Sequence, residues 1–205
     1  MDAISVVKTI SKIVEIRDPL TAGHQNRVAE LAQNIAEVMN MPEDRILALY
    51  ISALIHDLGM MAVPSDIICK SDRLNILEME LIKMHPQTGF DILSDLDFYL
   101  PVTNIILQHH ERVNGSGYPK GLKTGDTLIE SRILAVADTI DAMTSHRAYR
   151  PAFGLDKALK EITVNKEILF DPEVVEASLE FLSPKLRSDL QPLNWKRAAV
   201  QQRTP

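Results

Sequence analysis

Five of the six histidines in this 205-residue sequence lie at predicted helix ends or beside acidic residues inside apolar segments. His56 and Asp57 follow the apolar run at 49–55, and Asp138 follows another at 133–137. A buried carboxylate without a partner costs several kcal/mol, so a metal ion is an economical partner for it. Histidine and carboxylate without thiolate suit Fe, Mn or Zn rather than Ca.

The candidate ligands exceed the needs of one ion: His24, His56, Asp57, His85, His109, His110 and Asp138. Two ions bridged by one carboxylate form the arrangement that two-metal hydrolytic sites use. Each residue alone also has a structural explanation. His24 could lie on an exposed helix face, His56 could interact with a helix dipole, and Asp138 could accept buried hydrogen bonds. The combination favours the metal site.

Apolar residues that recur at spacings of three and four predict an almost entirely helical chain that positions these side chains. Thr21 is the expected N-cap of a helix that ends before Pro42, with His24 near its start. A second helix is expected at 43–57, with Gly59 as its stop. The further predicted helices are about 77–85, 90–93, 102–110, 130–144, and one from 172 to about 182 capped by Asp171.

Composition limits the class of protein. With 45% apolar and 24% charged residues, the chain fits one compact domain with a sizeable core. No run approaches 18 consecutive apolar residues, so we expect neither a membrane span nor direct membrane contact. The single cysteine, Cys69, excludes an internal disulfide and fits a cytoplasmic protein. A net charge of -6 argues against binding of long nucleic acid but allows a small anionic substrate at a local positive site.

Several segments, in order, resemble the HD-GYP phosphodiesterases, a branch of the HD metal-dependent hydrolases that typically cleave cyclic di-GMP. These segments are 17–24, 56–59 (HDLG), 109–119 (HHERVNGSGYP), 135–138 and 147–151. The resemblance implies an all-α, single-domain helical bundle with a dinuclear metal site between helices. It places the HD-GYP domain at 17–190, after an N-terminal helix at 1–16 that could serve as a linker and before a polar C-terminal tail at 191–205.

The resemblance also implies roles for individual residues. One ion would be held by His24, His56, Asp57 and Asp138, and the other by Asp57, His85, His109 and His110. Asp57 would bridge them and is the expected catalytic residue. The ions would be Fe or Mn, although a purified sample could carry Zn, Ni or Mg. The expected substrate contacts are Gly117, Tyr118, Pro119, Arg147 and Arg150. The loop could instead be only a tight turn, and the arginines could be surface ion pairs.

The implied function is metal-dependent hydrolysis of a cyclic dinucleotide, most often cyclic di-GMP, to pGpG or GMP by a hydroxide that bridges the ions. An alternative substrate is 3'3'-cyclic GMP-AMP. Met60 stands where the HDxGK motif has lysine, and loss of such a contact can slow turnover by about 10² to 10³-fold. A catalytically weak module that binds the nucleotide or a partner protein is therefore a second alternative, and an HD hydrolase of other nucleotides is a third. The family also suggests an upstream regulatory domain, and the first helix allows a homodimer.

Overall fold

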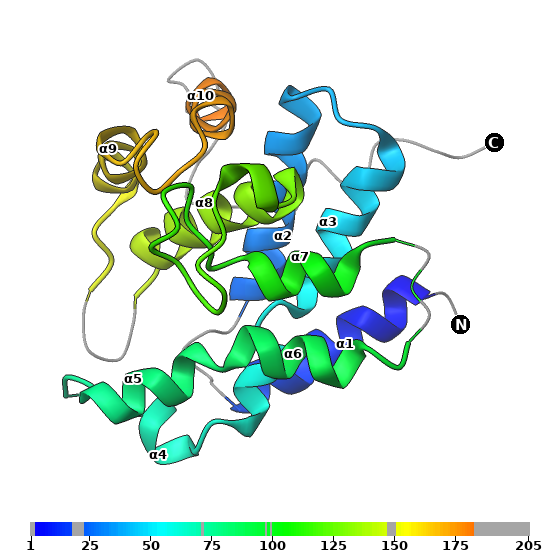
Figure 1. The fold of residues 1–205 in the computed structure, drawn as a ribbon, viewed down its shortest axis with the longest axis vertical. Helices are drawn as coiled ribbons and strands as arrows, with labels where there is room; N and C mark the ends of the chain where they lie inside the picture. Colours follow the sequence, from blue (N-terminus) through cyan, green and yellow to red (C-terminus); the bar gives the residue numbers. More distant parts are fainter. Residues whose placement is uncertain are drawn as a thin grey trace.

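The computed structural model describes residues 3–17, 23–70, 72–96, 98, 100–146 and 151–182. Its described part contains no strand, only isolated bridges that join 114 to 123 and 166 to 170. This confirms the prediction of an all-α fold (Figure 1). The helices are α1 (Ala3–Arg17), α2 (His24–Val38), α3 (Glu43–Ile55), η2 (Leu58–Ala62), α4 (Ser65–Ile68), α5 (Ile76–Lys83), α6 (His85–Leu93), α7 (Val102–Gln108), η3 (Thr124–Asp126), α8 (Ile129–Thr144), α9 (Leu155–Val164) and α10 (Pro172–Phe181).

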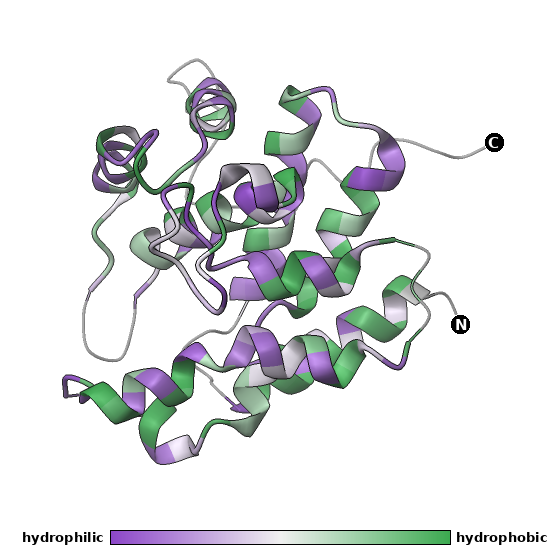
Figure 2. Ribbon diagram, in the orientation of Figure 1, coloured by the Kyte–Doolittle hydropathy of each residue, from purple (hydrophilic) through white to green (hydrophobic). Residues whose placement is uncertain are grey.

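The core lies where α2, α3, α7 and α8 pack together. In α2, one face of the helix is apolar and packs against the core, with Val28 and Ile35 fully inaccessible to solvent. The run at 133–137 in α8 is buried all round, as its continuous hydrophobicity implies. Figure 2 shows that apolar and polar residues are interspersed along these helices. The core thus fixes the relative positions of the helices that carry the candidate ligands.

Helix ends follow local signals in several places. Asp171 caps α10 by accepting hydrogen bonds from the N–H groups of Glu173 and Val174, and Pro172 occupies the first turn, as predicted. Asn75 and Glu78 form a capping box at the start of α5. At α2, the N-cap is Gly23, whereas the predicted cap Thr21 lies outside the described residues.

The prediction that Gly59 terminates the helix from Glu43 is wrong. α3 ends at Ile55, and Gly59 lies inside the short helix η2. A Cβ atom at Gly59 would lie 2.0 Å from the His85 carbonyl oxygen and 2.7 Å from the Gly89 nitrogen. Glycine is therefore needed because η2 packs directly against the start of α6, which carries His85.

One stretch, Glu43–Ala62, is long and apolar enough to cross a membrane by length and composition alone. In the structure this stretch comprises α3, a turn and η2, and its residues Leu49, Leu54 and Ile55 are buried in the core. Core helices of globular domains meet the same criteria, so this stretch gives little support for a membrane span.

The helix α1 packs on α3 and η2, and Val7 and Val14 on it are buried. The boundaries at 16, 17, 190 and 191 stay predictions, and the tail at 191–205 lies outside the described residues.

Candidate metal centre

The structure brings all seven predicted ligands together between the helices. His24 begins α2, His56 and Asp57 follow α3, His85 begins α6, His109 and His110 follow α7, and Asp138 lies in the middle of α8. The histidines His24, His56, His85 and His109 are buried, while the side chains of Asp57 and Asp138 are 21% and 16% exposed. Segments far apart in the sequence thus converge on one partly accessible site.

The ligand atoms form two separate groups and a third, His56, Asp57 and His109, that overlaps both, and within each group they lie no more than 4.8 Å apart. Of the two separate groups, one is His24, His56 and Asp138, and the other is His85, His109 and His110. Asp57 lies between them. Its Oδ2 is 3.2 Å from His56 Nε2 and 3.7 Å from His24 Nε2, whereas its Oδ1 is 3.5 Å from His85 Nε2. The two oxygens of one carboxylate therefore face different groups, as a bridging ligand requires.

In three of the histidines, a hydrogen bond at Nδ1 determines that Nε2 is the nitrogen available to a metal ion. His56, His85 and His109 each place Nδ1 at 2.6–2.8 Å from the carbonyl oxygen three residues earlier. Because a carbonyl only accepts, Nδ1 must donate, and Nε2 of the neutral ring carries a lone pair. The Nε2 atoms of His85 and His109 lie only 3.2 Å apart, so two lone pairs face each other. A cation between them removes this repulsion, and the donor set therefore fits a metal ion.

Carboxylates dominate the electrostatics of the His24 group. Burial alone would lower the pKa of His24, but hydrogen bonds with Asp138 and Asp141 outweigh it and raise the pKa to about 9. At His56, burial is likewise outweighed by Asp57, and the pKa is raised. Burial acts to raise the carboxyl pKa values, yet the nearby histidines hold the pKa of Asp57 and of Asp138 well below the usual range. Without a metal, this group holds protons on its imidazoles.

The second group differs. Burial lowers the pKa of His85, and burial with the charges of neighbouring histidines lowers that of His109 further. Burial and His85 lower the pKa of His110 to about 3. These three imidazoles are therefore neutral at pH 7 and need no deprotonation before they coordinate a cation.

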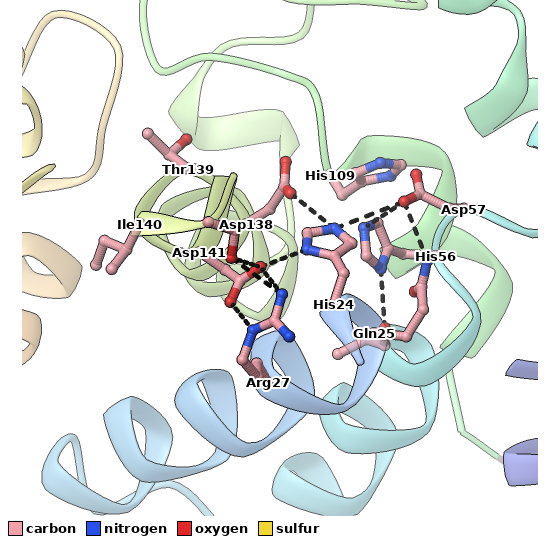
Figure 3. Close-up of polar contacts among 12 residues, drawn as sticks. His24, Gln25, Arg27, His56, Asp57, His109, Asp138, Thr139, Ile140 and Asp141 are labelled. Atoms are coloured by element: carbon pink, nitrogen blue, oxygen red, sulfur yellow. Dashed lines mark hydrogen bonds and ion pairs between the residues drawn. The ribbon is translucent and has the colours of Figure 1, made fainter. Parts of the chain in front are cut away.

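Three residues that the sequence analysis missed support the ligands (Figure 3). Asp141 Oδ2 is 2.6 Å from His24 Nδ1, and Arg27 donates to Asp141. Gln25 Nε2 donates to Asp57 Oδ2 at 3.0 Å. Two of them carry a sequence signal, because Arg27 lies three residues after His24 and Asp141 three after Asp138, on the same helix faces.

The loop after His110 is held over the site by a buried carboxylate. Glu111 accepts hydrogen bonds from the backbone N–H groups of Lys120 and Leu122, one at each oxygen. A Cβ atom at Gly117 would lie 2.4 Å from the His110 carbonyl oxygen, so only glycine allows the loop to cross there. The Tyr118 ring stacks on His110, with ring centroids 4.7 Å apart. The segment that contains Gly117, Tyr118 and Pro119 therefore lies against the candidate ligands.

The other sequence-predicted residues are less informative. Arg147 and Arg150 lie outside the described residues. Met60 is a half-buried residue of η2, three positions after Asp57. It has no group that can donate a hydrogen bond or neutralise a phosphate oxygen.

Comparison with known proteins identifies a family. The family model described as HD domain matches residues 8–174. The chain is 36% identical over 172 residues to the cyclic di-GMP phosphodiesterase response regulator RpfG of Xanthomonas campestris, covering 83% of this chain and 46% of the relative. It is 40% identical over 179 residues to a cyclic di-GMP phosphodiesterase of Thermotoga maritima, covering 85% of this chain and 48% of the relative.

The chain thus spans about half the length of these relatives. The structure also resembles a crystal structure of a cyclic GMP-AMP specific phosphodiesterase of Vibrio cholerae, with a TM-score of 0.69 at 18% identity, covering 93% of this chain and 51% of the other. This likeness concerns the fold alone. HD domain phosphohydrolases are metal-dependent, which agrees with the histidine and aspartate clusters. Together with the match over residues 8–174, these findings show that the chain belongs to the HD domain family, in its HD-GYP branch.

Proposed function

We propose that this protein is a metal-dependent phosphodiesterase that hydrolyses a cyclic dinucleotide, with cyclic di-GMP as the preferred substrate, to pGpG or GMP. The observation that carries the proposal is the pair of ligand groups that share Asp57 beside the Tyr118 loop. The names of the relatives support the substrate class.

The proposed site holds two divalent cations. His24, His56 and Asp138 would hold one, His85, His109 and His110 would hold the other, and Asp57 would contribute one oxygen to each. An all-nitrogen-and-oxygen donor set supports iron or manganese. When bound, two such cations activate water and offset negative charge on the phosphate oxygens.

The chain's own residues orient the reaction. The hydrogen bonds from Nδ1 of His56, His85 and His109 keep the Nε2 atoms directed into the site. The ring of Tyr118 covers His110 on the side of the loop, where a base or sugar of the substrate would lie. Arg147 and Arg150 are proposed to bind the phosphates in a bidentate manner. The proposal of an upstream regulatory domain rests on the family resemblance, that of a homodimer on the first helix, and that of a cytoplasmic location on the single cysteine.

The test is incubation of the purified chain with cyclic di-GMP and Mn²⁺ or Fe²⁺, with chromatography of the products and elemental analysis of the protein. Asp57→Asn should abolish hydrolysis because it weakens the ligand shared by both ions. Asp91→Asn, at an exposed position on α6 where Gln87 donates to it, is the matched control and should leave hydrolysis unchanged.

Each result has a defined meaning. Linear product from the wild type and none from Asp57→Asn supports the proposal. Hydrolysis of 3'3'-cyclic GMP-AMP but not of cyclic di-GMP would replace the substrate. Binding of the nucleotide without product in the presence of bound metal would favour the binding module that Met60 suggests.

A further inference from the structure

The ring of His24 is held differently from the rings of the other buried candidate ligands. His56, His85 and His109 donate from Nδ1 to a carbonyl three residues earlier, near the end of a preceding helix. His24, in contrast, is the first residue of α2. Its Nδ1 lies instead 2.6 Å from the carboxylate oxygen Oδ2 of Asp141, on α8. One ligand therefore depends on a charged group where the others depend on the backbone.

Asp141 is itself fixed firmly. Arg27 donates from Nε to Oδ1 at 2.6 Å and from Nη2 to Oδ2 at 3.0 Å, which is a bidentate pair. Arg27 Nη2 also donates to Ser145 Oγ at 3.0 Å, and Ser145 Oγ lies 3.3 Å from Asp141 Oδ2. The Asp141 side chain is only 5% exposed. Figure 3 shows this connection between α2 and α8 beside His24. The carboxylate therefore cannot rotate away from the imidazole without breaking several contacts.

Such a carboxylate changes the imidazole as a ligand. Accepting a hydrogen bond from Nδ1–H fixes the tautomer and makes Nε2 a stronger electron donor. The His24 group also contains the carboxylate of Asp138, with Oδ1 3.3 Å from His24 Nε2. The other group contains three imidazoles and shares only Asp57. A divalent cation in the His24 group therefore faces more negative charge and a more basic nitrogen.

We propose that Asp141, held by Arg27, is a positioning residue that makes the His24 group, once its imidazoles have lost their protons, the tighter of the two metal sites. This inference rests on the two-cation site proposed above. The two ions would then bind with different affinities, and the hydrogen bond from His24 to Asp141 would contribute to the difference.

The test is titration of the metal-free full chain with Mn²⁺ at pH 8.5, where protons compete with the metal for His24 less than at neutral pH, following free Mn²⁺ by electron paramagnetic resonance. Wild type should bind in two steps of different affinity. Asp141→Asn keeps the shape of the side chain but removes its charge, and should weaken the tighter step by about 10 to 100-fold while leaving the weaker step unchanged. His110→Ala should remove the weaker step and leave the tighter one.

A matched control lies on the same helix. Glu130 is buried on α8 and accepts from Arg45 Nε at 2.6 Å and Nη2 at 2.9 Å, the same geometry without a histidine. Glu130→Gln and Asp141→Asn should both lower the melting temperature of the metal-free protein, but only Asp141→Asn should change Mn²⁺ affinity.

Three results would overturn the inference: equal affinities in the wild type, unchanged affinities in Asp141→Asn, or equal weakening of both steps. Any of these can occur while the wild type still binds two ions and hydrolyses the dinucleotide. In contrast, absence of Mn²⁺ binding by the wild type would refute the proposed site itself.

Discussion

Metal binding by this protein should depend steeply on pH because His24 must lose a proton to coordinate. Its pKa is raised to about 9, so only a small fraction of the metal-free protein has a deprotonated His24 at neutral pH. From pH 6.5 to 8.5 the deprotonated fraction of a group with pKa 9 rises by about 75-fold, against about twofold for an ordinary histidine. The raised pKa of His56 adds to the slope in the same direction.

The assay is the dissociation constant of the Mn²⁺ bound by the His24 group at pH 6.5, 7.5 and 8.5, in buffers that do not bind the metal. Calorimetry in two buffers of different ionisation enthalpy should report release of at least about one proton at pH 7.5. His24→Gln binds more weakly at every pH but should lose most of the slope. An affinity that changes less than about threefold over this range in the wild type would refute the reasoning, since it would mean that the carboxylates do not hold a proton on His24.

Three further predictions concern the loop, Met60 and the metal-free protein. Gly117→Ala should lower kcat/KM by about 100-fold without changing the metal content, because the new Cβ would force the loop away from His110. The control is Gly125→Ala, whose Cβ would meet nothing within 4 Å. Equal kinetics of the two variants would contradict the prediction. Met60→Lys should raise kcat by about tenfold or more in steady-state assays with unchanged Mn²⁺ affinity, and a lower kcat would show that a cation is unfavourable there. In chemical denaturation, the free energy of unfolding of the metal-free protein should decrease from about pH 6.5 to 9. The pKa values of His24 and His56 are raised in the folded state, so the stability that their protonated forms contribute is lost as they deprotonate. A free energy of unfolding that rises over this interval would disprove the raised pKa values.

The fold class and the seven candidate metal ligands could be predicted from the sequence. Histidines are rare in apolar helical segments, and the periodicity placed most of them at helix ends. The prediction that Pro86 ends a helix at His85 is wrong, because α5 ends at Lys83 and His85 begins α6, with Pro86 in its first turn. The predicted helix at 130–144 differs from α8 by one residue at its start. The helix α9 at Leu155–Val164 was not among the predicted elements. Its apolar residues recur at spacings of three and four, at 155, 158, 159 and 162, which is typical of an amphipathic helix.

What could not be predicted depends on contacts between elements. Gly59 looks like a helix stop in the sequence, and only the packing of η2 on α6 explains the glycine. The pairing of Asp141 with Arg27, 114 positions apart in the sequence, follows only from the packing of α2 against α8. That the two carboxylate oxygens of Asp57 face different ligand groups likewise follows only from the structure, because a sequence does not show where either oxygen points.

The hydrogen bonds from the histidine rings to carbonyls have a consequence for how such domains can lose activity during evolution. Ala53, Ile82 and Ile106 lie in the last turns of their helices, where carbonyl oxygens lack a helical partner. Each ring thus completes a helix terminus as well as presenting a ligand. Replacement by an apolar residue would leave a carbonyl without its donor, at a cost of about 1–3 kcal/mol if it is buried. Inactive descendants that keep this fold should therefore carry asparagine or glutamine at these positions more often than leucine or alanine.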